Sequence, residues 1–256
     1  MKIYSTLLMA LMMFGSATLT AKERQFYQIK IYHLKTKAQE TLVDNYLEKT
    51  FLPALHHAGI KQAGVFKPVT ADTAEIRIYV LIPFQSLEQF VNLDKTLQAD
   101  KSFQTNGKDY TDAAWNNIPY TRIESILLQA FPGMPILEAP ALKAPKNERV
   151  YELRSYESPS EKYHVNKVKM FNTGDEIGIF RNLNFNAVFY ASVISGPRMP
   201  NLMYMTTFNN KEDRDEHWKA FSADPKWKTL SAMEEYSHNV SKSEILFLRP
   251  TDYSDL

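Results

Sequence analysis

Polar and aromatic side chains alternate with apolar ones in two segments, and this alternation could build a binding site. The alternating side chains are Gln28, Lys30 and Tyr32 in "YQIKIY", and Glu152, Arg154 and Tyr156 in "YELRSY". Residues two apart lie on one face of a strand, so we expect both sets to lie opposite the face of Tyr27, Ile29 and Ile31, which would meet the helices. Buried polar groups are costly unless they are paired. The pattern predicts a ligand-binding group in a cavity between two sheets, formed by Lys30, Tyr32, Glu152, Arg154, Tyr156 and Tyr204.

The chemistry of this group depends on its two cations. Lys30 and Arg154 would attract an acidic or carbonyl-bearing ligand, and the tyrosines would supply aromatic or hydroxyl contacts. The alternative is structural, because Glu152 and Arg154 could satisfy each other and only close the barrel. If the site is catalytic, the first residues to test are His33, Arg154 and Tyr156.

The histidines offer one candidate base and no metal site. His33 ends a predicted strand near the expected cavity mouth, where it could act as a general base or be an ordinary surface residue. His56 and His57 are adjacent, so on a helix they diverge by about 100° and cannot easily share a metal. The other three histidines lack a partner at ligand spacing. We therefore expect no metal, and no cofactor is predicted.

Trp218 and Trp227 lie nine residues apart across an "ADPKW" turn. They could form an aromatic wall for a ligand. Large aromatic side chains contribute strongly to core packing, so we favour the interpretation that they anchor the helix and the turn.

Composition narrows the class of partner. The chain has 30 basic and 29 acidic residues and a net charge of +1, so it does not predict a nucleic-acid surface. With no cysteine, disulfides and thiolate sites are excluded. No phosphate loop or dinucleotide motif occurs.

An internal repeat organises the chain. At an offset of 124 residues, Tyr27 aligns with Tyr151, and four further anchors keep that offset. These anchors are Phe66 with Tyr190, Phe84 with Phe208, Ala99-Asp100 with Ala223-Asp224, and Phe103 with Trp227. Ile126 and Ile245 differ by 119, which indicates that the second copy is about five residues shorter before its last strand. Two similar units on one chain are expected to pack on each other.

Each unit reads as β-α-β-β-α-β, the ferredoxin-like order of the α+β class. The first unit has strands at 26–34, 61–69, 74–84 and 122–131, with helices at 37–59 and 86–97. The second has strands at 150–157, 186–194, 201–208 and 243–250, with helices at 160–180 and 211–221. A four-stranded sheet with helices on one face must cover its other face. The two sheets are therefore expected to pack together as an intramolecular pseudo-dimer.

The first 21 residues read as a signal peptide rather than a membrane anchor. Lys2 precedes the short apolar run "IYSTLLMALMMFG", and small residues lead to Ala21. A span needs roughly 20 apolar residues, so we expect cleavage after Ala21, no stable membrane insertion, and a secreted or periplasmic protein. The remaining expected domains are repeat 1 at 22–131, a Pro-rich linker at 132–148, and repeat 2 at 149–256.

Two segments of the second unit resemble the NIPSNAP family. They are "YELRSY" and "YMTTFNNKEDRDEHWKAFSADPKWKTLSA", and the first unit is similar to a diverged copy, with "ADKSF" in place of "ADPKW". The resemblance covers about residues 25–131 and 149–249. It implies a dimeric α/β barrel, and it leaves the biochemical role unassigned.

Three functions are compatible with this pattern. The leading hypothesis is a protein that binds a small organic ligand between its two sheets. The second is an enzyme, because barrels of the implied kind host cofactor-independent oxygenases and some haem enzymes. The third is a scaffold whose barrel is filled by Phe and Tyr side chains. The pseudo-dimers could also pair again.

Overall fold

Two similar halves build the structure, a computed structural model that describes residues 23–70 and 74–256. The first half contains β1 (Phe26–Leu34), α1 (Lys37–Tyr46), the π-helix η1 (Leu47–Phe51), α2 (Leu52–His57), β2 (Gly64–Pro68), β3 (Ile76–Phe84), α3 (Leu87–Ala99), α4 (Lys101–Asn106), α5 (Lys108–Thr111) and β4 (Arg122–Ala130). The second half contains β5 (Val150–Glu157), α6 (Glu161–Asn172), α7 (Glu176–Asn182), β6 (Phe189–Ser195), β7 (Asn201–Phe208), α8 (Lys211–Ala223), α9 (Pro225–Ser231), the 3-10 turn η2 (Glu234–Tyr236) and β8 (Lys242–Pro250). The predicted order of strands is confirmed in both halves. The predicted signal peptide lies outside the described residues.

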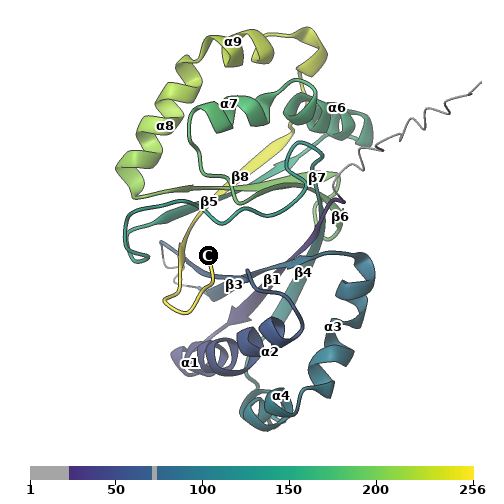
Figure 1. Cartoon of the computed structure of the whole chain (residues 1–256), viewed down its shortest axis with the longest axis vertical. Helices are drawn as coiled ribbons and strands as arrows, with labels where there is room; N and C mark the ends of the chain where they lie inside the picture. The colour runs from purple at the N-terminus through teal and green to yellow at the C-terminus, as the bar shows by residue number, and fades with distance from the viewer. Residues whose placement is uncertain (1–22, 71–73) are drawn as a thin grey trace, which may run out of the picture.

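The eight strands close into one antiparallel barrel in the order β1-β3-β2-β8-β5-β7-β6-β4. Each half supplies four adjacent strands, and the halves join where β2 pairs with β8 and where β4 pairs with β6. Figure 1 shows the helices of each half covering the outside of its own strands, so the barrel lies between two helical layers. The expected pseudo-dimer within one chain is confirmed.

Strand pairing confirms most of the predicted repeat. Ile29 pairs with Leu81 in the first half, and Leu153 pairs with Met205 in the second, each partner displaced by 124 residues. The Asp residues that cap α4 and α9 also match, because Asp100 and Asp224 each accept two backbone hydrogen bonds.

One anchor of the predicted repeat is wrong. Phe66 pairs with Tyr79, and the counterpart of Tyr79 is Met203, which pairs with Ala191 rather than with Tyr190. Phe66 points into the barrel, whereas Tyr190 packs under the helices, because a shift of one residue turns a strand over.

The last strand shows a second difference from the predicted alignment. Ile29 pairs with Ile126 and Leu153 with Leu246, so the offset is 120 and the second half is four residues shorter there. Ile245 is 46% exposed and is therefore not the counterpart of the buried Ile126.

The predicted assignment of strand faces is reversed. Tyr27, Ile29 and Ile31 lie inside the barrel, together with Tyr151 and Leu153 of the other half. The alternating polar residues face the helices. Both faces of these strands are covered, but the interior is closed by strands on every side and takes the apolar set. The helices can supply polar partners to the other set.

One end of the barrel is filled with aromatic side chains. Tyr27 lies 5.2 Å from Phe189 and Phe66 lies 4.9 Å from Tyr151, measured between ring centroids. Leu256 packs into the same cluster. Gly64 is required here, because a Cβ at this position would lie 2.4 Å from the Phe66 ring. We call this region the filled end.

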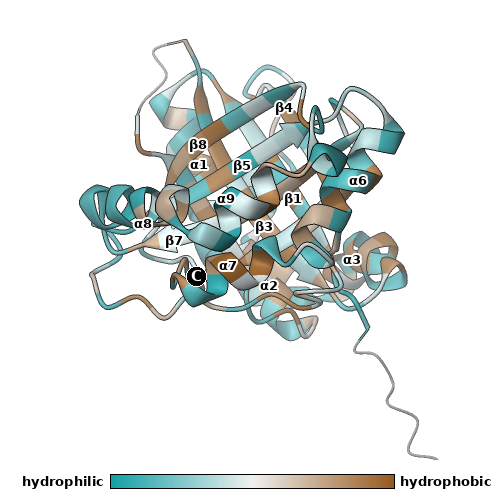
Figure 2. Cartoon of the chain, turned by 90° about the horizontal axis from the view of Figure 1, so that it is seen from above, coloured by the Kyte–Doolittle hydropathy of each residue, from teal (hydrophilic) through white to brown (hydrophobic). Residues whose placement is uncertain are grey.

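The linker packs against the barrel without forming helix or strand over residues 132–148. Gln25 accepts the Leu137 N–H through Oε1 at 2.7 Å, and Glu138 donates its N–H to the Val188 carbonyl at 3.1 Å. Figure 2 shows hydrophilic residues along outer helices such as α8. Within residues 23–70 and 74–256, no helix has the length and apolar character that crossing a membrane requires.

Candidate functional site

A cavity of about 520 Å³ opens at the other end of the barrel, between the two sheets. Both halves contribute to its apolar wall, which includes Ile29, Ile31, Tyr79, Ile126, Leu153, Met203 and Leu246. His33 and four charged residues surround its mouth, namely Arg77, Glu124, Arg198 and Glu244. Small-molecule sites commonly combine this size with an apolar wall and a few polar groups. We call it the barrel cavity.

His33 lies at the mouth between two carboxylates. β1 places it on the inward face, two residues beyond Ile31. Its Nδ1 is 2.9 Å from Oε1 of Glu75, and its Nε2 is 3.1 Å from Oε1 of Glu124. The second contact is an ion-pair distance without hydrogen-bond geometry. Among the described residues Nε2 has no hydrogen-bond partner, so a ligand group that enters the mouth can bond to it.

Two arginines also pair with carboxylates at the mouth. Arg77 Nε lies 2.7 Å from Oε2 of Glu75. Although desolvation acts to raise it, hydrogen bonds from His33 and Arg77 lower the pKa of Glu75. Arg198 forms an ion pair with Glu244. The Glu75 carboxylate is therefore held as an anion beside His33.

The backbone of Arg198 is strained. Its φ angle is 61°, in the left-handed region that costs a non-glycine residue roughly 1–2 kcal/mol. Strained residues of this kind concentrate at functional sites. Arg198 lies in the loop between β6 and β7 and lines the mouth.

Tyr79 supplies a hydroxyl to the wall. Burial raises the pKa of Tyr79, and Arg77 opposes that shift. The phenol therefore stays protonated at neutral pH and can donate a hydrogen bond. The barrel cavity thus offers an apolar body, the hydroxyl of Tyr79 and the imidazole of His33.

The structure separates the predicted site residues. His33, the candidate base, lines the barrel cavity. The six predicted ligand-binding residues do not, because the reversed strand faces turn them toward the helices. They are Lys30, Tyr32, Glu152, Arg154, Tyr156 and Tyr204. Their predicted place between the sheets is therefore wrong.

Glu152 is the centre of a buried network under α8. Its fully buried carboxylate accepts hydrogen bonds from Arg154 Nε at 2.6 Å, from Arg214 Nε at 2.7 Å and from Trp218 Nε1 at 2.8 Å. The Arg154 guanidinium also stacks 3.6 Å from the Trp218 ring centroid. Because every charge has a partner, this geometry favours the structural alternative for the Glu152–Arg154 pair.

The network continues through two tyrosines. Arg154 Nη1 donates to the Tyr156 hydroxyl at 2.9 Å, and that hydroxyl lies 2.9 Å from the Tyr204 hydroxyl. Burial, with Tyr156 beside it, raises the pKa of Tyr204. The Tyr204 phenol therefore remains a neutral hydrogen-bonding group.

A second buried ion pair lies nearby. Lys167 Nζ is 2.9 Å from Oε2 of Glu176, and both side chains are almost fully buried. Burial raises the pKa of Glu176 against the opposing charge of Lys167. Sequence reasoning missed this pair because each residue stands in a helix with an ordinary charged composition.

Sequence reasoning also missed the charged mouth of the barrel cavity. Arg77, Glu124 and Glu244 stand near the first residues of β3, β4 and β8, where the inward face reaches solvent. A signal existed, since each occupies an inward position at a strand end. It could be used only with the correct face assignment.

The two tryptophans pack as anchors. Trp218 contacts the rings of Phe185 and Phe221 at centroid distances of 5.0 and 5.4 Å, and Trp227 lies 4.5 Å from Phe221. These contacts are consistent with the core interpretation of the motif.

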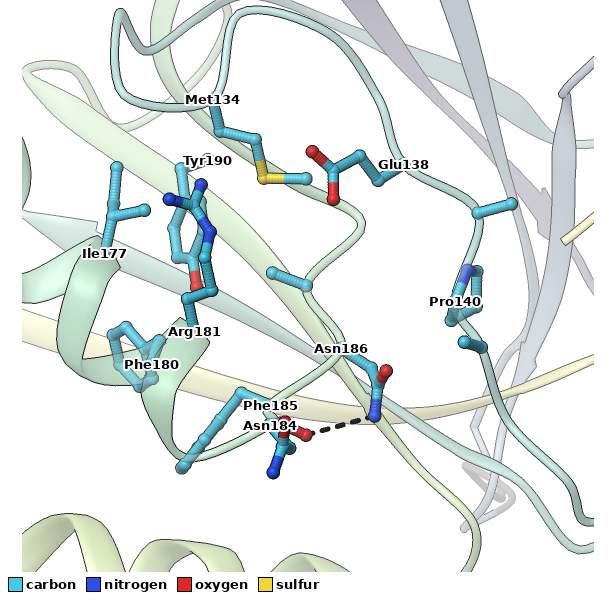
Figure 3. A pocket seen from close by; sticks show the side chains of 13 residues that line it. Met134, Glu138, Pro140, Ile177, Phe180, Arg181, Asn184, Phe185, Asn186 and Tyr190 are labelled. Atoms are coloured by element: carbon cyan, nitrogen blue, oxygen red, sulfur yellow. Dashed lines mark hydrogen bonds between the residues drawn. The ribbon is translucent and has the colours of Figure 1, made fainter.

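A smaller hollow of about 240 Å³ lies outside the barrel, between the linker and α7. Figure 3 shows Glu138 on the linker side and Arg181 beside Tyr190 on the helix side. Glu138 and Arg181 are both exposed. Only the linker and the second half contribute to this hollow, which is distinct from the shared barrel cavity.

Solved structures with the same architecture include three proteins that align over most of their length. A candidate monooxygenase from Fusobacterium nucleatum has 9% identity and a TM-score of 0.56, with 89% of this chain and 93% of that chain covered. A candidate monooxygenase from Lactobacillus acidophilus has 14% identity and a TM-score of 0.56, with 89% and 94% covered. An anthrone oxidase-like protein has 8% identity and a TM-score of 0.50, with 90% and 93% covered. At such identities the likeness shows the fold alone.

The fold defines a dimeric α/β barrel contained in one chain. Residues 151–255, the second half, match the NIPSNAP family, which confirms the resemblance seen in that half. The first half lies outside that match and shares strand order and register with the second half. No curated protein matches the chain in sequence.

Proposed function

We propose that this protein binds a small organic ligand in the barrel cavity, with an apolar body inside and a polar group at His33. The observation that carries the proposal is a cavity of about 520 Å³, lined by both halves, with an imidazole between two carboxylates at its mouth. The ligand group at the mouth would be a hydroxyl or carbonyl, because these groups can exchange hydrogen bonds with His33 and Tyr79.

Native mass spectrometry of the protein purified from its own host tests this proposal. We expect the mass of one chain plus one fixed small adduct. A bare chain mass, together with no uptake of apolar probes such as a naphthalene dye, would contradict it.

Variants then place the ligand in the cavity. Ile31→Phe should fill the barrel cavity, so that the adduct is lost while the fold is retained. His33→Ala should weaken binding about tenfold or more, as loss of one hydrogen bond worth roughly 1.4 kcal/mol would do. His57→Ala, an exposed histidine elsewhere in the first half, is the control and should not change binding.

A second candidate function is an oxygenase-type enzyme that uses dioxygen as oxidant. His33 favours it, because a base at the mouth could remove a proton from an acidic phenol or ketone. Two of the structural neighbours are named as candidate monooxygenases. Dioxygen consumption with an anthrone, lost in His33→Ala and kept in His57→Ala, would support it. Equal rates for the protein and a protein-free blank would exclude that substrate class.

We also propose that the mature protein is secreted or periplasmic and begins at Lys22. The apolar run that precedes Ala21 supports this. Mass analysis of the protein exported by its host should give the mass of residues 22–256. An intact Met1 in the cell pellet would contradict it.

A further inference from the structure

Lys30 lines a further pocket, on the helix side of the first half. This pocket has a volume of about 390 Å³ and is separate from the barrel cavity. Phe51, Phe90 and Leu93 form its apolar surface, and Asp94 stands beside them. Val91, which is 74% exposed, lies at its edge. The pocket can therefore admit an apolar group from solvent.

The amine of Lys30 has no close polar partner. Among the described residues it makes neither a hydrogen bond nor an ion pair. Instead, its Nζ lies 5.2 Å from the Phe51 ring centroid and 5.4 Å from that of Tyr32. Burial lowers the pKa of Lys30, with Asp94 opposing that shift. An amine in these surroundings is neutral, and so nucleophilic, at a lower pH than a solvated lysine.

Comparison with the second half shows how this state arises. Arg154, the counterpart of Lys30, is paired to Glu152 and stacked on Trp218. At the two positions 124 residues earlier the first half has Gln28 and Asp94. Gln28 donates to Ser125 at 2.7 Å rather than to the site. The carboxylate that held the cation is absent, and the space of the tryptophan ring is open.

The helix above Lys30 differs in the same way. Leu47–Phe51 form a π-helical turn, in which the N–H of Leu52 bonds to the carbonyl of Leu47. Pro53 follows at once and lacks an N–H, which accounts for the irregular turn. π-turns of this kind often occur at functional sites. Here the turn sets Phe51 against the amine, whereas the second half has Asp175 at that position.

We propose that Lys30 is a nucleophilic lysine that forms an imine with a small aldehyde or ketone bound in this pocket. The amine nitrogen attacks the carbonyl carbon, and a carbon–nitrogen bond forms. The carbonyl oxygen leaves as water with the two amine protons, so no oxidant or reductant is needed. Asp94 in the same pocket can accept and return a proton. The apolar surface selects carbonyl compounds with an aromatic or aliphatic body.

Reductive trapping tests the proposal on the intact protein. The protein is incubated at pH 7 with benzaldehyde and sodium cyanoborohydride, and the benzylated lysines are located by peptide mass mapping. We expect Lys30 to be labelled at least about ten times faster than the exposed Lys35 and Lys49, as a lysine activated by its surroundings should be. Lys30→Arg retains a cation but cannot form an imine, and it should lose only the fast label.

The control is the same reaction in denaturant, where the advantage of Lys30 should disappear. Equal labelling of Lys30 and the exposed lysines in the folded protein would overturn the proposal, as would no label at Lys30. The Ile31→Phe variant separates the two sites. It fills the barrel cavity and should leave the fast labelling of Lys30 unchanged. Failure of this proposal is therefore distinguishable from failure of the ligand site between the sheets.

Discussion

At the scale of single residues, the two halves treat the same strand position in opposite ways. Glu152 and Arg154 face α8 and are bound by Arg214 and Trp218. Lys30 faces α3 and, among the residues that the structure describes, its amine forms no ion pair or hydrogen bond and contacts only aromatic rings. Removing one partner of a buried ion pair strongly destabilises the folded protein, because the other charge is left buried without compensation.

Glu152→Gln should therefore destabilise the protein by about 3 to 5 kcal/mol. Removing the carboxylate leaves Arg154 and Arg214 together in a buried place. Chemical denaturation would measure the loss. Gln28→Ala, at the matching position of the first half, is the control and should cost much less. A loss no larger than that of the control would mean that solvent screens the network.

The same carboxylate should make stability depend on pH. Although burial acts to raise it, the hydrogen bond from Arg214 and the charge of Arg154 lower the pKa of Glu152. Its stabilisation is thus complete above the unfolded value near 4.5 and is lost as pH falls through the lower folded pKa. The stability gap between wild type and Glu152→Gln should shrink in acid. A gap that stays constant down to pH 2 would contradict this.

The residue scale also marks the limit of sequence reasoning. Alternation along β1 gave two correct sets of residues, and His33 was correctly placed at a cavity mouth. The alternation could not say which set faces inward, since Tyr27 and Tyr32 are both fully buried. Pairing partners such as Arg214 come from distant helices, so composition alone could not assign them.

At the scale of elements, the two halves begin equivalent helices with the same kind of N-cap. Asp100 accepts the N–H of Ser102 at 2.7 Å, and Asp224 accepts that of Lys226 at 2.8 Å. These caps begin α4 and α9, and the predicted repeat had aligned the two Asp residues with each other. The one-residue shift in β2 and β6 was not predictable, because a loop can absorb a residue without changing the pattern on either side.

Asp224→Ala should cost about 1 kcal/mol, the usual loss for an N-cap. Asp100→Ala should cost a similar amount plus the contact between Asp100 and His57 Nδ1 at 2.7 Å. Thermal unfolding of the two variants measures both losses. Unchanged melting temperatures would show that packing alone begins these helices.

At the scale of the whole molecule, the barrel is closed along both joins and packed at one end. Closure at β2–β8 and β4–β6 prevents the two halves from unfolding independently. We expect a single unfolding transition with both Trp fluorescence and backbone circular dichroism. Two separated transitions would contradict a shared barrel core.

Leu256→Ala tests the filled end. Leu256 is 3% exposed and belongs to the interior cluster, so its truncation should cost about 2 to 4 kcal/mol. Leu87→Ala, at a position 43% exposed, is the control and should cost far less. Calorimetry gives both values. Equal costs would show that Leu256 does not close the barrel.

A barrel that is packed at one end and open at the other has the form of a cup, so a ligand has only one route into it. A bound molecule must enter and leave through the same charged mouth, with its apolar part innermost. A guest longer than the cup is deep would keep its head at the surface, beside His33 and Arg198. Another molecule could then bind that exposed end while the apolar part of the ligand stays in the cavity.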